Sequence, residues 1–309
     1  MFDVAISQLT APRLDLDQEL AHVTAAGLDA IALWRPKLSD IGIGTVASAL
    51  ACAGVRVSSL QWAGGFTAGD GRSFDESVAD AVEAIEAARL LAAPVLVIHS
   101  GCRGGHTRRH AARLVRDALE TLAPIAAGAD VTLALRPIHA AVEPGCSLLT
   151  RLGEAVDLVD RLDHPAVGLA VDLWQFADAA DLPGLLPRLA RRAAVVQVAD
   201  RIGPPSPLAD RLPAGQGTLP LEPLLAELIR HGYRGDFEFD PVGELVEARG
   251  HAGVVQDVAR TAEAWLGRTP VGRDLGPILA ASRTPHRRPA AAGVGSRRSQ
   301  ASSQTVSRG

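Results

Sequence analysis

The chain has 309 residues with a formal net charge of −4, and its 47% hydrophobic and 21% charged residues are an ordinary globular composition for one large or two small domains. Its three cysteines are far apart and form no CxxC pair, which excludes a zinc knuckle and gives no support for a disulfide framework. The first residues carry no basic segment and no apolar run reaches about 18 residues, so we expect a soluble cytoplasmic protein without a leader or a membrane span.

Short apolar runs alternate with longer amphipathic stretches, and the runs predict eight strands. The predicted strands cover residues 4–9, 29–34, 55–62, 94–101, 131–135, 167–173, 194–200 and 236–240. Apolar residues at helical spacing, such as Val78, Val82 and Ile85, predict helices. These helices cover residues 73–92, 106–127, 147–162, 219–233 and 253–267. Strands that alternate with helices imply parallel strands joined by crossover helices.

Eight such units in about 265 residues are the size of one eight-stranded parallel (β/α)8 TIM barrel, an α/β fold that we assign to residues 1–266. A doubly wound sheet would fit the same alternation. No GxGxxG motif follows the first predicted strand, however, which weakens the dinucleotide-binding form of that alternative.

The C-terminal segment 267–309 differs in composition from the rest. It holds eight arginines and one acid, Asp274, so the net charge of −4 combines +7 here with −11 elsewhere. The segment is rich in Ser, Arg, Gly and Pro and lacks periodic apolar residues, which predicts disorder. A basic tail could touch nucleic acid or an acidic partner. We favour a solvated extension and expect no nucleic-acid partner.

In a barrel of this kind the chemistry lies where strands end and the following loops begin. Polar or aromatic residues stand at these positions: Gln8, Trp34, Gln61, Trp62, His99, Arg136, His139, Asp172, Gln175, Gln197 and Asp240. Arg136 is unusual because it follows the apolar run 131–135, and a buried charge is costly there unless a partner compensates it. His106 and His110 lie one helical turn apart, but the arginines around them indicate a solvated face rather than a metal pair.

Four stretches at the later strand ends resemble, in order, motifs of the sugar phosphate isomerase/epimerase family, the xylose isomerase-like TIM barrels. "LALRPIH" is similar to the family's L-A-[LI]-E-P-L-H, and "GLAVDLWQF" to G-[LV]-x-x-D-x-x-H. "VVQVAD" is similar to [VI]-x-H-x-x-D, and "GYRGDFEFD" to G-Y-x-G-x-x-x-[VI]-E. "RLPAGQG" matches the family's arginine before a Gly-x-Gly turn, at Arg211. The resemblance covers residues 1 to about 266 and implies the barrel fold.

The resemblance also implies a divalent metal held by Glu, Asp, His and Glu, with the two glutamates moving a proton next to a carbonyl. Asp172 matches the Asp, and Asp240 stands in for the last Glu with a shorter side chain. Arg136 replaces the first Glu and Gln197 replaces the His. Because two ligands are lost and Arg136 is permanently charged, we expect no metal and no cofactor at this site. Gln175 replaces a further histidine that contacts substrate in the family.

We expect the guanidinium of Arg136 to take the place of the metal, bridging Asp172 and Asp240 and stabilising a substrate oxyanion. Asp240 or His139 is then the obvious base. The residues expected to bind a small-molecule substrate are Trp34, Trp62, His99, Gln175, Gln197 and Arg211.

These features favour a sugar isomerase/epimerase-like protein that acts by proton transfer on a small polyhydroxylated or carbonyl metabolite, without a divalent metal. Two alternatives stay open: a metal-independent lyase, dehydratase or cyclase of a specialised pathway, and a non-catalytic relative that only binds a ligand or partner. Association of identical copies stays open as well.

Overall fold

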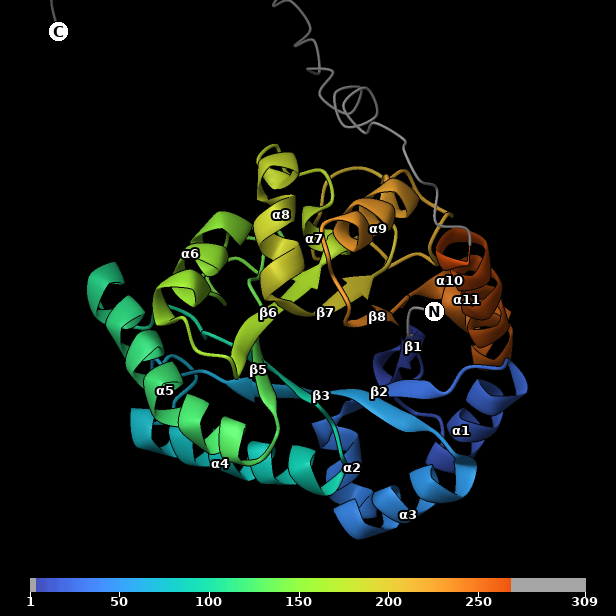
Figure 1. The fold of residues 1–309 in the computed structure, drawn as a ribbon, viewed down its shortest axis with the longest axis horizontal. Coiled ribbons are helices and arrows are strands. Elements are labelled where there is room, and N and C mark those ends of the chain that lie inside the picture. Colours follow the sequence, from blue (N-terminus) through green and yellow to red (C-terminus); the bar gives the residue numbers. More distant parts are fainter. Residues whose placement is uncertain (1–3, 268–309) are drawn as a thin grey trace, which may run out of the picture.

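Eight parallel strands close into a barrel in the computed structural model, which describes residues 4–267 (Figure 1). Each strand pairs with the next one in sequence, and β8 pairs with β1. The strands are β1 (Val4–Ser7), β2 (Ala30–Trp34), β3 (Arg56–Gly64), β4 (Val95–His99), β5 (Thr132–Leu135), β6 (Val167–Asp172), β7 (Ala193–Val198) and β8 (Asp236–Phe239). The predicted eight-stranded parallel barrel is confirmed.

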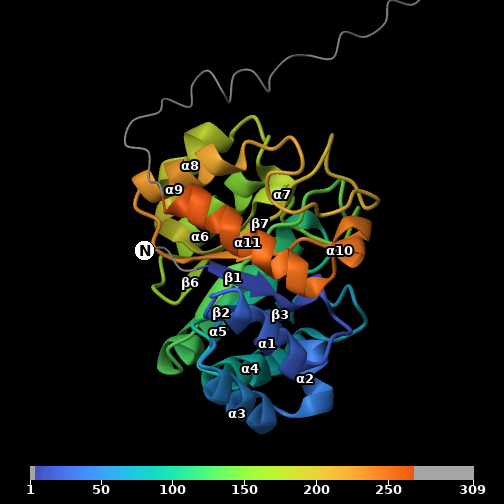
Figure 2. The same ribbon diagram turned by 90° about the vertical axis from the view of Figure 1, so that its right-hand side faces the viewer.

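Helices surround the barrel and connect its strands. They are α1 (Leu16–Ala25), α2 (Arg35–Ile41), α3 (Ile43–Ala53), α4 (Phe74–Leu90), α5 (Arg108–Gly128), α6 (Leu152–Leu162), α7 (Leu173–Phe176), α8 (Leu182–Arg192), α9 (Leu221–Arg230), α10 (Glu244–Arg249) and α11 (His251–Leu266), with a 3-10 turn over Gln8–Thr10. Figure 2 shows α11 beside α1, next to the join between the last and first strands.

Local signals in the sequence set several helix starts. Ser73 accepts a hydrogen bond from the backbone of Glu76, whose side chain accepts one from Ser73, so a capping box begins α4. The Thr107 side chain accepts a hydrogen bond from the backbone of His110 and so caps the start of α5. The predicted helix 147–162 begins only at Leu152. Its first residues instead bond the loop after β4, where the backbone nitrogen of Leu148 donates to the oxygen of Gly101 at 2.8 Å.

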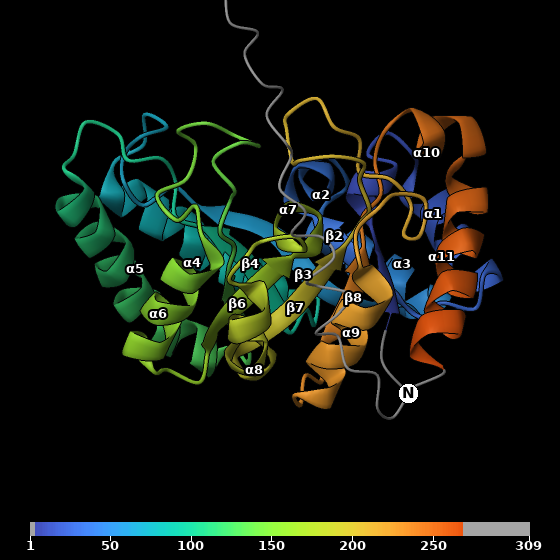
Figure 3. The same cartoon turned by 90° about the horizontal axis from the view of Figure 1, so that it is seen from above.

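The core has two parts, because successive side chains of a strand point to opposite faces. Outward side chains such as Phe237 and Phe239 pack in the large cluster beneath the helices. A second cluster fills the inside of the barrel and consists of Val95, Val97, Ala134, Ala170 and Val195. Figure 3 shows that the long connecting loops gather at one end of the barrel.

No helix within residues 4–267 is long and apolar enough to cross a bilayer. The disorder predicted for 267–309 falls, apart from Gly267, on residues outside those described.

Candidate active site

The inward side chains of four neighbouring strands turn polar at the carboxyl ends of the strands. Ala134 is followed two residues later by Arg136, Ala170 by Asp172, Val195 by Gln197, and Glu238 by Asp240. Since the inward period is two residues, all four end residues continue the inward rows. Arg136 follows an apolar strand because it is the next residue to point into the barrel, where it bonds the carboxylate of Asp172.

Arg211 joins the two carboxylates of the site. Its Nη1 donates to Oδ2 of Asp172 and its Nη2 to Oδ1, both at 3.1 Å. Nη2 also contacts both oxygens of Asp240, at 2.5 and 2.6 Å, and Nε donates to the backbone oxygen of Asp240 at 3.1 Å. Both terminal nitrogens of this guanidinium therefore face the carboxylates, while Nε bonds the backbone of Asp240.

The loop between β7 and α9 brings Arg211 to this position. Asp200 organises the loop, because its carboxylate accepts hydrogen bonds from the backbone nitrogens of Gly215 at 3.1 Å and Leu219 at 3.0 Å. The backbone of Arg211 pairs with that of Val242 in both directions, at 2.9 and 2.7 Å. The arginine thus enters between the ends of β6 and β8.

Arg136 contacts only one of the two carboxylates. Its Nη2 donates to Oδ2 of Asp172 at 2.6 Å, and its guanidinium lies over the ring of Trp62, 5.9 Å from the centroid. The expectation that Arg136 bridges both carboxylates is wrong. Arg136 stands on the strand next to Asp172, whereas Asp240 lies two strands further around the barrel, within reach of Arg211.

The two carboxylates differ in their protonation. Burial would raise the pKa of Asp172, but the charges of Arg211 and Arg136 outweigh it and hold that pKa well below its usual range. Gln175 Nε2 also donates to Asp172 at 2.7 Å. Burial, together with the nearby charge of Asp172, raises the pKa of Asp240 to about 6 against the opposing charge of Arg211. Asp240 therefore titrates close to neutral pH, as a general base should.

A cavity of about 540 Å³ opens onto this network. The predicted site residues among its lining are Trp34, Trp62, Arg136, Gln175, Arg211 and Asp240. Trp174 also lines it, with Arg211 over its ring at 5.0 Å from the centroid. Flat apolar walls beside charged donors suit a small ligand that has both carbon-bound hydrogens and oxygens.

Two predicted histidines lie beside the cavity wall rather than in it. The His139 ring packs against Phe176, and its Nδ1 accepts a hydrogen bond from the backbone of Ala141 at 3.2 Å. The His99 ring meets the edge of Trp62, with centroids 6.2 Å apart. Burial and the charge of Arg136 lower the pKa of His99 to about 4, so this ring is neutral at physiological pH.

Gln197 lies between Asp172 and Glu238 in the strand register and is buried. Neither its Nε2 nor its Oε1 has a hydrogen-bond partner within the described part of the chain. A buried amide left unpaired costs about 1–3 kcal/mol. The amide of Gln197 is thus an unsatisfied group in the position of the family's metal-binding histidine.

Glu238 is a buried residue that sequence reasoning missed. It accepts hydrogen bonds across the barrel from Ser58 Oγ at 2.7 Å and from Gln61 Nε2 at 3.1 Å. Burial raises its pKa to about 7, although hydrogen bonds from serines oppose the shift. The signal was present in "DFEFD", since Glu238 precedes Asp240 by two residues and so shares its inward face.

A second buried network holds Trp34 in place. The backbone nitrogen of Trp34 donates to Gln8 Oε1 at 2.9 Å, and Gln8 Nε2 donates to Glu19 at 2.9 Å. Lys37, the only lysine of the chain, lies 2.8 Å from the other oxygen of Glu19. The buried ion pair of Lys37 and Glu19 therefore stabilises, through Gln8, the cavity wall that contains Trp34.

The donor set at the strand ends does not fit the divalent metal that the resemblance implies. Arg136 and Gln197 occupy two of the four ligand positions, and the oxygens of Asp172 and Asp240 already contact Arg211. Among residues 4–267, no three side chains of His, Cys, Asp or Glu are placed together to hold a metal ion. A guanidinium occupies the place between the carboxylates where a cation would bind.

One related sequence and two solved structures illustrate what this chain is similar to. A Streptomyces coelicolor protein named "Putative hydroxypyruvate isomerase" is 29% identical over 255 residues, which cover 76% of this chain and 88% of that protein. The structure of the IOLI protein with a bound zinc atom has a TM-score of 0.76 at 17% identity, over 88% of this chain and 100% of that one. D-psicose 3-epimerase from Clostridium cellulolyticum H10 has a TM-score of 0.67 at 14% identity, over 87% and 98%.

The two solved structures share the fold of this chain, which agrees with the closed barrel described above. The family described as the xylose isomerase-like TIM barrel matches residues 20–255, well over half of the chain. The chain therefore belongs to the xylose isomerase-like TIM barrel family.

Proposed function

We propose that this protein is a cytoplasmic, sugar isomerase-like enzyme that transfers a proton within a small hydroxycarbonyl metabolite, without the divalent metal of its family. The observation that carries the proposal is Asp240. It is a buried carboxylate with a pKa raised to about 6, it lines a cavity, and it is paired with a guanidinium. A base with this pKa is half ionised near pH 6 and strong enough to remove an activated carbon-bound proton.

In the proposed reaction, Asp240 removes the proton from the carbon next to the substrate carbonyl. The electron pair moves onto the carbonyl oxygen and forms an enediolate. Asp240 then returns the proton to the neighbouring carbon while the hydroxyl proton passes from one substrate oxygen to the other. The product is an isomer of the substrate, with no atom or electron gained or lost.

Arg136 and Arg211 supply the charge that the enediolate needs. Both line the cavity, and both are anchored by Asp172, which stays ionised. Donors that are already oriented stabilise a developing oxyanion without reorganisation. A guanidinium carries one charge rather than two, so we expect slower turnover than a metal would support.

The site favours isomerisation over epimerisation by two bases. Epimerisation of that kind needs an acid and a base on opposite faces of the carbon. Asp172 bonds its arginine partners and has no exposed surface, and Glu143 and Asp210 of the cavity lining are exposed on loops. Asp240 is therefore the buried carboxylate that lines the cavity. One carboxylate can shift a proton between adjacent carbons on a single face.

The substrate panel follows from the relatives. Hydroxypyruvate enters first because of the name of the Streptomyces coelicolor protein, followed by ketoses and their phosphates. The experiment incubates metal-free full-length protein with each compound in deuterated water and follows deuterium at carbon by NMR. We expect wash-in and an isomeric product. The D240N variant should show neither, whereas D17N, which changes an exposed aspartate on α1, should match the wild type.

Other outcomes would overturn the proposal in distinct ways. Elimination products without an isomer would indicate a lyase or dehydratase. Ligand-induced thermal stabilisation without deuterium exchange, across the whole panel, would indicate a protein that only binds.

A further inference from the structure

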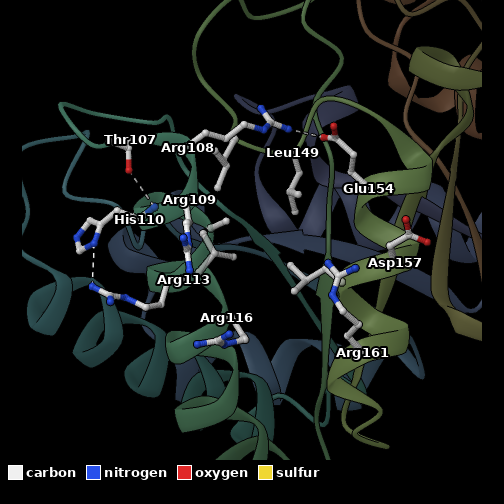
Figure 4. Close-up of a pocket in the computed structure, with 14 residues that line it drawn as sticks. Thr107, Arg108, Arg109, His110, Arg113, Arg116, Leu149, Glu154, Asp157 and Arg161 are labelled. Carbon is white, nitrogen blue, oxygen red and sulfur yellow. Dashed lines mark hydrogen bonds and ion pairs between the residues drawn. The ribbon is translucent and has the colours of Figure 1, made fainter.

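A groove with arginine-rich walls lies between α5 and α6 on the outside of the helix ring (Figure 4). Its volume is about 800 Å³, and none of the residues that line it line the candidate active site. Arg109, Arg113 and Arg116 rise from α5, three and four residues apart, so they share one face of that helix. Arg161 comes from α6, across the groove, as Figure 4 shows.

The acids around the groove compensate only part of this positive charge, although Arg116 pairs with Asp117 at 3.0 Å and with Glu120 at 3.4 Å. Glu154 pairs with Arg108 at 2.9 Å, and Asp157 pairs with Arg188 of α8 at 2.7 Å. Within residues 4–267, neither Arg109 nor Arg161 has a hydrogen bond or ion pair. In the same part of the chain, the one side-chain partner of Arg113 is a ring nitrogen of His110, at 2.9 Å.

An extended acidic protein surface fits the groove better than a small anion. A single solvent-exposed charge pair contributes about 0–1 kcal/mol, so a complex held by such pairs needs several of them at once. The arginines of α5 spread over about 10 Å of helix, which also suits an extended partner. The segment 268–309 is itself basic, so its charge opposes it as the occupant.

The chain carries a matching acidic surface beside the groove. Asp75, Glu76, Glu83 and Glu86 are exposed on α4, and their spacing places them on one face of that helix. Glu86 also pairs with Arg89 of the same helix at 2.6 Å, so the net charge of the face comes mainly from the other three acids. Leu90, at the end of the same helix, is 51% exposed. In Figure 1, α4 lies next to α5 on the side away from α6, and the two helices pack together.

We propose that a second copy of this chain docks on the groove through the acidic face of its α4. A twofold axis that runs along the outer face of α5, parallel to that helix, makes the contact twice, since it sets the α4 of each copy against the groove of the other. Such an axis leaves the partner's helices running in the same direction as those of the groove. The start of α4 then faces Arg109, and Glu83 and Glu86, further along α4, face Arg113 and Arg161.

The proposal is tested on the full-length protein by analytical ultracentrifugation at low and high salt. We expect a dimer at low salt whose dissociation constant rises at least tenfold at 0.5 M NaCl, since salt screens the charge pairs. The variants R113E/R161E and E83R/E86R should each be monomeric while keeping the wild-type far-UV spectrum and melting curve. The control R13E/R191E reverses two exposed arginines elsewhere and should dimerise normally.

Mixing the two monomeric variants provides the decisive measurement. One has an acidic groove and an acidic α4, and the other has a basic groove and a basic α4, so only the mixed pair has two attractive contacts. We expect the mixture to form a heterodimer over the concentration range in which the wild type dimerises. A wild-type monomer at 100 µM in low salt would overturn the proposal, as would a dimer that tolerates both reversals. A monomer whose groove arginines instead bind a polyanion such as heparin would overturn it too.

Discussion

Arg211 contacts the carboxylate of Asp240 through a single nitrogen, whereas it contacts the carboxylate of Asp172 through two. The two carboxylates share one guanidinium, and their pKa values are driven apart. The pKa of Asp172 lies well below its usual range, and that of Asp240 is raised to about 6. Two acids of the same kind thus acquire different roles from their surroundings: one anchors the arginines, and the other is available to accept a proton.

The first prediction concerns the pH dependence of turnover. Asp240 acts only when ionised, so kcat/KM should rise with pH through an apparent pKa near 6 and level off above pH 7. Below pH 6 the rate should fall about tenfold for each pH unit, since the ionised fraction falls by that factor. The substitution D240N should lower kcat/KM by ~10²–10⁴-fold above pH 7, where Asp240 of the wild type is ionised. A rate that is flat between pH 5 and pH 8 would remove Asp240 from the reaction.

The second prediction concerns metal binding. The substitutions R136E and Q197H, made in an R211Q background that frees Asp172 and Asp240 from the second guanidinium, rebuild a set of Glu, Asp, His and Asp donors at the strand ends. We expect calorimetry on chelator-treated protein to show micromolar Mn²⁺ binding for the triple variant and none for the wild type. Oxygen and imidazole ligands suit this ion, and a guanidinium repels it.

The variants R136E and Q197H, each made alone in the R211Q background, are the controls for that experiment. Each restores one ligand only, so each should bind the ion at least tenfold more weakly than the triple variant. Micromolar binding to the wild type would contradict both the donor-set argument and the proposed metal-free reaction.

Strand alternation is sufficient to predict that Arg136, Asp172 and Asp240 meet at one end of the barrel, because this depends only on a period of two and on parallel strands. It is not sufficient to predict which arginine joins the carboxylates. Arg211 arrives on a loop whose path depends on hydrogen bonds to Asp200 and on pairing with the backbone after β8. These contacts join residues far apart in sequence and leave no local pattern.

His139 is a second residue whose contacts the sequence pattern could not predict. Its place after β5 made it a candidate base, but the loop turns its ring onto Phe176. Its backbone nitrogen instead donates to Gln175 at 2.7 Å, and Gln175 donates in turn to Asp172. Motif position predicts the neighbourhood of a residue, while the conformation of its loop decides which of its atoms reaches the site.

The third prediction concerns the ion pair behind Trp34. Lys37 is 9% exposed and Glu19 is fully buried, so K37M leaves a buried carboxylate without its cation. We expect K37M to lower the free energy of unfolding by about 3 kcal/mol in urea titrations at pH 7. The double variant K37M/E19Q removes both charges and should recover most of that loss. Equal losses in the single and double variants would show that packing of the lysine stem, rather than charge, stabilises this wall.

The fourth prediction concerns Glu238 and the pH dependence of stability. Burial raises its pKa to about 7 in the folded protein, against an ordinary value of 4.5. Between these two values the folded state binds more protons than the unfolded state, so stability falls as pH rises from 4.5 to 7 and the loss is complete above pH 7. A shift of this size corresponds to about 3 kcal/mol.

The E238Q variant keeps the shape of the side chain but cannot ionise, and its amide oxygen can still accept the hydrogen bond from Ser58. We therefore expect E238Q to gain stability relative to wild type by up to about 3 kcal/mol at pH 8, and to show little gain at pH 4.5, in urea unfolding at both pH values. A gain of equal size at both pH values would mean that Glu238 keeps an ordinary pKa inside the barrel.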